Sequence, residues 1–403
     1  LALCDWSDLQ RTRRRIARVY CSPRLASAHY DRLDAAGASE AALLLDEVQR
    51  RAGPDGKVLD IKPLLLAACS NMFTRYMCSR RFDYDDKTFV QMVRRFDDIF
   101  WDINQGYAVD FLPWLLPFYR SHMSRLSLWA HEIRQFILAS IIDPHRRAIE
   151  EKKRAAAAAK EAGEVSEDDE GPADFTEALL LHLENDPDLT WQHVLFELED
   201  FLGGHSAIGN LLMLSLAAAA KEKKVAQKIR EEADAATGGG ARPLTLSDRA
   251  SMPYTEATVL ETLRRASSPI VPHVATQDTS VDGYAVAKGT VVILNNYELN
   301  TSEEHWEAPL EFRPERFLCP ETGRVAKPEY FIPFGTGKRT CIGSRLVHAF
   351  GFLLLGSLVQ RFDISPAAIE GESGLPEDCI RTVPACVALP PDTFPLVFRP
   401  RSA

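Results

Sequence analysis

The segment that decides the fold is FIPFGTGKRTCIGSR, residues 331–345. It contains the pattern F-x-x-G-x-R-x-C-x-G, with Phe334, Gly337, Arg339, Cys341 and Gly343 at its fixed positions. Glycine lets the backbone turn tightly and come close to a flat ligand. Cys341 stands just before an apolar stretch, 344–362, that is typical of a helix. Its sulfur would therefore face backbone N–H groups and the positive end of a helix dipole.

These residue types suit a haem whose iron is bound by a thiolate. The sulfur of Cys341 would donate electron density to the iron, and N–H groups bonded to the sulfur would tune its potential. Arg339 would pair with a haem propionate, and Phe334 would pack beside the macrocycle. The alternative is that Cys341 is a small core residue, which leaves the rest of the pattern unexplained.

Composition describes a folded chain with enough apolar residues for a large core. Of the 403 residues, 46% are hydrophobic and 26% are charged, which excludes a mostly disordered protein. A net charge of −10 makes the chain as a whole a poor partner for nucleic acid. The eight cysteines include no CxxC pair, which favours free thiols in a reducing compartment.

Periodicity predicts a mainly α fold with a minor β part, in one domain over residues 1–403. The apolar spacing predicts helices over 6–20, 41–51, 59–78, 89–100, 121–154, 190–220, 221–235, 254–267 and 344–362. Short β-like runs lie between 271 and 294, with turns at Asp282-Gly283 and Lys288-Gly289, and a terminal hairpin is expected over 386–398.

Two segments could be mistaken for other kinds of structure. The acidic low-complexity stretch 155–174 is expected to be a solvated loop, because its composition cannot bury apolar area. Residues 201–220 carry no charge and are long enough to cross a bilayer. Glycine, histidine and asparagine dilute that stretch, so we expect a helix buried in the core.

The 331–345 loop resembles the haem-binding signature of the cytochrome P-450 monooxygenases, and further motifs follow in the family's order. Glu261 and Arg264 form E-x-x-R on one helix face, and residues 314–317 read P-E-R-F. The resemblance implies a cytochrome P-450 fold in which Glu261, Arg264 and Arg316 form a buried ion-pair triad. It also implies haem b as the cofactor and Cys341 as the metal ligand.

The resemblance adds two residues to the expected haem-binding set of Phe334, Gly337, Arg339, Cys341 and Gly343. Trp6, in the basic first helix, corresponds to a tryptophan that faces the haem in relatives. His273 corresponds to a residue that contacts a propionate. Gln10 stands where relatives have an arginine for the other propionate contact, with Arg11 beside it.

The helix expected on the opposite, distal side of the haem departs from the family. Relatives usually carry A/G-G-x-D/E-T there, whose acid and threonine relay protons to bound oxygen. The aligned residues of this chain are Gly203, Gly204, His205, Ser206 and Ala207. The glycines would leave room for dioxygen, and protons would come from water, Ser206, His205 or the substrate. Gly204, His205 and Ser206 are therefore the candidate catalytic residues, and sequence drift compensated by ordered water is the alternative.

This departure, together with segments 100–119, 203–210 and 295–306, resembles the Spook-type members of arthropod ecdysteroid synthesis. The resemblance implies a sterol-like substrate, dioxygen, and NADPH used through a cytochrome P-450 reductase that docks near Lys338 and Arg345. It implies the cytosolic face of the endoplasmic-reticulum membrane. The aromatic stretch 101–119 would be core, pocket wall or a membrane-facing edge.

Relatives begin with a membrane anchor, a hinge and a sheet, which this sequence does not contain before Trp6. We therefore expect a fold truncated at its N-terminus, from a longer product or a truncated gene. Two other functions stay open: a haem-thiolate isomerase or dehydratase that uses no dioxygen, and a haem-binding protein without turnover.

Overall fold

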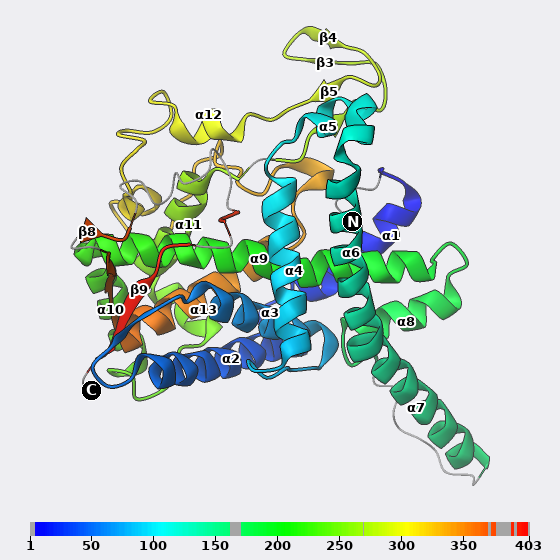
Figure 1. The fold of residues 1–403 in the computed structure, drawn as a ribbon, viewed down its shortest axis with the longest axis horizontal. Coiled ribbons are helices and arrows are strands. Elements are labelled where there is room, and N and C mark those ends of the chain that lie inside the picture. The colour runs from blue at the N-terminus through cyan, green and yellow to red at the C-terminus, as the bar shows by residue number, and fades with distance from the viewer. Residues whose placement is uncertain are drawn as a thin grey trace.

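The structure, a computed structural model, describes residues 5–161, 171–268, 270–369, 372–375, 388–390 and 393–401 (Figure 1). The α-helices are α1 (Asp8–Cys21), α2 (Ala28–Ala52), α3 (Lys62–Cys78), α4 (Lys87–Ile103), α5 (Ala108–Phe111), α6 (Arg120–Ile137), α7 (Asp143–Glu161), α8 (Phe175–Asn185), α9 (Trp191–Lys221), α10 (Lys223–Thr237), α11 (Pro253–Ala266), α12 (Asn296–Thr301) and α13 (Ser344–Arg361). The 3-10 helices are η1 (Pro113–Tyr119), η3 (Leu246–Ser251), η4 (Pro314–Phe317) and η5 (Gly337–Arg339), and η2 (Leu138–Ile142) is a π-helix. The strands are β1 (Lys57–Leu59), β2 (His273–Val274), β3 (Thr279–Val281), β4 (Tyr284–Val286), β5 (Val291–Val292), β6 (Phe362–Pro366), β7 (Ala368–Ile369), β8 (Glu372–Ser373) and β9 (Leu396–Pro400). The expectation of a mainly α fold with a minor β part is confirmed.

Helix α9 runs through the centre of the molecule and packs against α3, α4 and α13 (Figure 1). Thr190 caps its first turn by accepting a hydrogen bond from the His193 N–H, and the His193 side chain bonds back to the Thr190 N–H. By length and composition α9 could cross a membrane, but 83% of its most apolar window is buried inside the fold. The prediction of a buried core helix is confirmed.

The small sheets lie at the rim of the helical body. β9 is the middle strand of a three-stranded sheet and pairs antiparallel with both β1 and β6. β3 and β4 form the hairpin expected at Asp282-Gly283, where both residues have positive φ. The prediction of a terminal hairpin over 386–398 is wrong for β9, because β9 pairs with β1 and β6, which lie outside that segment. Residues 386–387 and 391–392 of that segment lie outside the described residues.

Several helix boundaries differ from those predicted, and capping side chains explain the differences. The first helix begins at Asp8, because Ser7 caps it through the Gln10 N–H, so Trp6 precedes the helix. The helix expected over 41–51 begins at Ala28, after the cap residue Ser27. A short apolar window shows only the most periodic part of such a helix.

The acidic segment 155–174 is partly helical. α7 continues to Glu161, because its run of alanines with lysine and glutamate has high helix propensity, so the loop prediction is wrong for 155–161. Residues 162–170 lie outside the described residues. Asp174 then caps α8 by accepting a hydrogen bond from the Glu177 N–H at 2.9 Å.

The aromatic stretch around α5 and η1 lies at the surface. Phe111, Trp114 and Phe118 are 74%, 69% and 82% exposed. The expectations of core and pocket wall are therefore wrong for these three side chains, because the prolines that break the helical pattern hold them in short exposed turns. We call Phe111, Trp114 and Phe118 the aromatic cluster.

Candidate functional site

The signature loop, residues 331–345, is a tight backbone structure that carries Cys341 near its end. Gly335 and Gly337 have φ of +74° and +69°, a backbone conformation in which a residue with a side chain would be strained. The Cys341 N–H donates to the Phe334 carbonyl at 2.9 Å, and the Thr340 N–H donates to the Gly337 carbonyl at 3.2 Å. These bonds hold the loop closed and fix the backbone position of Cys341.

The sulfur of Cys341 lies at the start of α13, as predicted, with one side exposed. The backbone N–H groups of Gly343 and Ser344 lie near it and act to lower the pKa of the thiol. Protein packed around its other sides raises the pKa of the thiol, while those N–H groups and the Arg14 charge act in the opposite direction. The donor set is that of a thiolate ligand: a sulfur open on one side and supported from behind by backbone N–H groups.

The other predicted cofactor-binding residues are distributed around this loop. The Phe334 ring is half-buried and meets the His348 ring edge-on at 5.5 Å. Lys338 lies over the Trp6 ring at 5.8 Å, which places Trp6 beside the loop. His273 is half-buried on β2, and its Nδ1 is buried without a hydrogen-bond partner among the described residues. An orphaned polar nitrogen of this kind fits a carboxylate partner such as a haem propionate.

Arg339 and Gly343 keep the positions that the pattern assigns to them. Arg339 is half-buried in η5, close enough to Arg14 to lower the pKa of that side chain. A Cβ on Gly343 would lie 4.0 Å from the Cys341 sulfur, so the glycine keeps the approach to the sulfur open. Together with the N–H groups behind Cys341 and the orphaned His273 nitrogen, these residues fit a haem held by one thiolate.

One face of α9 is less buried than the rest of that core helix. Gly203, Gly204 and Ala207 are half-buried there, whereas His205 and Ser206 are fully buried. Positions 203 and 207 share a helix face. Phe96 and Phe73 come within 3.1 Å and 3.3 Å of where a Cβ on Gly203 and Gly204 would lie. The two glycines therefore allow close packing of these rings.

His205 and Ser206 face α4. His205 Nδ1 lies 2.5 Å from the Leu202 carbonyl and Nε2 lies 3.2 Å from the Val93 carbonyl. Burial lowers the pKa of His205, so it is neutral near pH 7 and donates from one nitrogen only. The neutral ring therefore donates to one of the Leu202 and Val93 carbonyls, and the Ser206 hydroxyl lies 3.4 Å from Nε2. The structure does not bring these two side chains to the half-buried face of Gly204.

A buried polar network lies beside this part of α9, and no sequence motif indicated it. Lys62 of α3 and Asp97 of α4 form an ion pair at 2.7 Å. Asn210 of α9 donates to Asp97 at 2.9 Å and to the Ser206 carbonyl at 2.8 Å. The three side chains are far apart in the sequence, so only packing reveals the network. It fixes how α4 crosses α9.

The ion-pair triad expected from the E-x-x-R and P-E-R-F motifs is present. Arg264 binds both oxygens of Glu261 at 2.8 Å, and Arg316 Nε binds Glu261 Oε1 at 3.2 Å. Glu261 and Arg264 are fully buried. Arg264 also donates to the Asn300 and Pro309 carbonyls, at 2.5 Å and 2.8 Å. The triad therefore ties α11 to the segment that leads to the signature loop.

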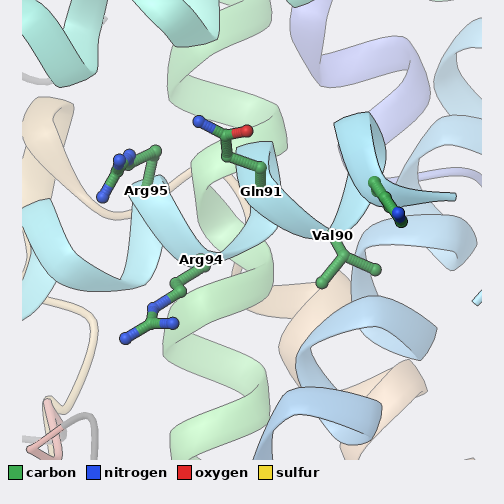
Figure 2. Close-up of a pocket in the computed structure, with 5 residues that line it drawn as sticks. Val90, Gln91, Arg94 and Arg95 are labelled. Atoms are coloured by element: carbon green, nitrogen blue, oxygen red, sulfur yellow. The ribbon is translucent and has the colours of Figure 1, made fainter. Parts of the chain in front are cut away.

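Figure 2 shows a shallow hollow on the solvent side of α4. It is lined by Lys87, Val90, Gln91, Arg94 and Arg95. The hollow contains none of the candidate site residues, and Arg95 is already paired with Glu132 at 2.7 Å. We do not assign it to the site.

A thiolate loop at a helix start, a core helix with a half-buried face and a buried Glu-Arg-Arg triad define a haem-thiolate enzyme. Comparison with known proteins agrees: the cytochrome P-450 profile matches residues 8–379, so the chain belongs to the cytochrome P-450 family. Cytochrome P-450 307a1 of Drosophila melanogaster is 46% identical, over 100% of this chain and 73% of its own length. Cytochrome P-450 2E1 of Oryctolagus cuniculus is 29% identical, over 90% of this chain and 70% of its own length.

Family membership establishes the general chemistry of the protein. It is a cytochrome P-450 enzyme, and the family implies a haem-thiolate cofactor, dioxygen, a reductase and an organic substrate. Cytochrome P-450 18a1, also of Drosophila melanogaster, is 31% identical over 77% of this chain and 57% of its own length. The identity to the first fly protein is much higher and extends over the whole chain.

Proposed function

We propose that this enzyme is a monooxygenase that oxidises a sterol or steroid in ecdysteroid synthesis, with Cys341 as the iron ligand of haem b. The observation that carries the proposal is the exposed Cys341 just before α13, with the backbone N–H groups of Gly343 and Ser344 acting to lower the pKa of its thiol. When bound, the haem supplies activation of dioxygen and insertion of one oxygen atom into the substrate.

The residues around the loop would hold and orient that group. His273 and Arg339 are the candidate partners for its propionates, and Phe334 and Trp6 are the candidate ring contacts. On the opposite side, Gly203, Gly204 and Ala207 would form the floor over which dioxygen and substrate meet. His205 and Ser206 lie behind this floor, and we assign them to positioning α9 against α4. Water or the substrate would then supply the protons.

Electrons would come from NADPH through a flavoprotein reductase on the Cys341 side. Lys338 and Arg345 are both exposed there, next to the signature loop. An acidic partner surface would be steered to such cations, with an association rate that falls as salt rises.

The substrate class rests on resemblance. The sequence departs from the usual acid–threonine pair as the Spook-type members do, and the relative that aligns with the whole chain is an insect cytochrome P-450. A large apolar sterol is the substrate class that this similarity supports.

The aromatic cluster supports a location at the endoplasmic-reticulum membrane, on its cytosolic face. Phe111, Trp114 and Phe118 project from short turns, where exposed aromatic side chains can enter the headgroup region of a bilayer. A flotation assay with phosphatidylcholine vesicles tests this role. We expect the wild-type chain to float and the triple serine variant to float at least several-fold less. Equal flotation of the two proteins would contradict the membrane role of this cluster.

The experiment that tests the function combines the haem-loaded enzyme with reductase, NADPH and 7-dehydrocholesterol. A monooxygenase consumes oxygen and NADPH in proportion to oxidised sterol. An isomerase or dehydratase would convert sterol with no oxygen uptake, and a haem-binding protein would do neither. Either of the last two results would contradict the proposal.

A further inference from the structure

We propose that Arg14 is a positioning residue that holds the signature loop and makes the haem iron easier to reduce. The inference rests on the proposed role of Cys341 as the iron ligand. It concerns a residue of α1 that belongs to no sequence motif described above.

The contact between Arg14 and the loop is direct. Arg14 is half-buried on α1, and its Nη2 donates to the Thr340 carbonyl at 2.6 Å. Thr340 directly precedes Cys341, and its own N–H bonds to the Gly337 carbonyl. The guanidinium therefore clamps the residue before the ligand from a helix more than 300 positions away in the sequence.

The charge of Arg14 acts on the sulfur. Its guanidinium bonds to the carbonyl of Thr340, the residue directly before Cys341, so the charge lies close to the sulfur. A guanidinium stays protonated at any pH at which the protein is folded. Reduction of the iron adds one negative charge to the site, and a fixed cation in a partly buried position favours the reduced state.

The neighbouring residues of α1 show why this role belongs to Arg14. Gln10, which occupies the position of the arginine found in relatives, is buried and accepts from Arg13 Nη1 at 3.5 Å. Arg13 is itself paired with the buried Glu197 at 2.6 Å. Arg14 instead directs its charge at the loop that carries Cys341.

The test is the one-electron reduction potential of the haem-loaded protein, measured by spectroelectrochemical titration. In Arg14→Gln we expect the ratio of reduced to oxidised protein at a fixed electrode potential to fall about tenfold, or about 59 mV for a one-electron couple. Arg14→Lys keeps the charge and should recover most of the loss. Arg15→Gln is the control, because it removes the same charge from an exposed position one residue further along α1. It should change the ratio less than about twofold.

The outcomes separate this inference from the proposed function. A wild-type reduced carbon-monoxide spectrum typical of histidine ligation would remove Cys341 as the ligand. A thiolate-type spectrum with equal potentials in wild type and Arg14→Gln would overturn the role of Arg14 alone. If Arg14→Gln retains no haem, the potential of Arg14→Lys is the test. A potential of the lysine variant near the wild-type value supports the charge effect. A tenfold fall in its ratio of reduced to oxidised protein contradicts that effect.

Discussion

Arg264 is the residue whose surroundings make it most sensitive to substitution. Its guanidinium is fully buried, and Glu261 and three backbone carbonyls accept its hydrogen bonds. Removing one partner of a buried pair leaves the other charge uncompensated, which costs about 3–5 kcal/mol. Arg264→Ala should therefore give misfolded protein that binds no haem, measured as the haem content of purified protein and by denaturant unfolding.

Arg313 provides the matched control for that substitution. It pairs with Glu307 at 2.7 Å, but Arg313 is partly exposed and Glu307 is largely in solvent. Such pairs contribute at most about 1 kcal/mol, so Arg313→Ala should stay folded and load haem. A stable, haem-loaded Arg264→Ala protein would mean that the buried triad does not hold the core together.

Ala207 is the residue through which the unusual distal helix can be tested. It is half-buried on the face of Gly203, whereas Ser206 is fully buried, so a threonine is better accommodated at 207 than an acid at 206. If the reaction depends on the absence of a proton donor at position 207, Ala207→Thr should lower product yield or change the product. Adding or removing one positioned donor can change a rate by about 100-fold.

Ala207→Val is the control, because it adds the same bulk and β-branch without a hydroxyl group. Product analysis and the ratio of product to NADPH consumed are the measurements. Identical products, rates and ratios in the alanine, valine and threonine proteins would show that position 207 does not control the reaction.

Among individual residues, those of the signature loop and of the ion-pair triad were predictable, because they belong to short sequence motifs that occur in a fixed order. The sequence did not predict Arg14 beside Cys341 or the ion pair of Lys62 with Asp97. Those contacts join distant helices whose packing no local pattern specifies. The catalytic roles of His205 and Ser206 stay a prediction; the sequence motif alone did not show that both side chains are buried in the core.

The junction between α7 and α8 depends on one histidine. His145 contacts the Ile141 carbonyl at 2.7 Å and Asp174 Oδ2 at 2.9 Å. Burial alone would lower the pKa of His145, but these acceptors outweigh it, so its pKa is raised above 6.5. Burial would raise the pKa of Asp174, and the bond to His145 outweighs that effect, so its pKa is lowered below 3.8.

The sign of the pH dependence follows from these two directions. The raised pKa of His145 contributes stability that is full below about pH 6.5 and is lost as pH rises through its folded value. The lowered pKa of Asp174 contributes stability above about pH 3.8, which is lost only in acid. Amide hydrogen exchange at the start of α8 should therefore speed up as pH rises above about 6.5, beyond the intrinsic effect of pH.

His145→Gln supplies the comparison for that measurement, because glutamine has no titration in this range. Its opening free energy at the start of α8 should be independent of pH over the same interval. A wild-type protein with an equally flat profile would show that the histidine does not hold the junction in its charged form.

Among the elements, long periodic helices were the most predictable. The helix expected over 190–220 was observed as α9 (Trp191–Lys221), and the one expected over 344–362 as α13 (Ser344–Arg361). Boundaries set by a cap, such as Ser27 before α2, were missed because one side-chain hydrogen bond decides them. The pairing of β9 with β1 could not be predicted, because it joins segments more than 300 residues apart.

In the whole molecule, we propose that the fold presents the thiolate of Cys341 to a haem. The buried helix α9, the ion-pair triad and the N–H groups at the start of α13 would support that arrangement. The fold class was predictable because the signature loop identifies a family whose architecture is shared. The position of Trp6 beside Lys338 became visible only with the folded chain.

Cysteine ligation of the haem iron is tested by the absorption spectrum of the reduced, carbon-monoxide-bound protein and of its Cys341→Ser variant. We expect the long-wavelength Soret band of a thiolate adduct in the wild type. The variant should lose that band, because a serine oxygen does not replace the electron donation of sulfur. A wild-type band typical of histidine ligation, or a thiolate band that survives in Cys341→Ser, would show that Cys341 is not the iron ligand.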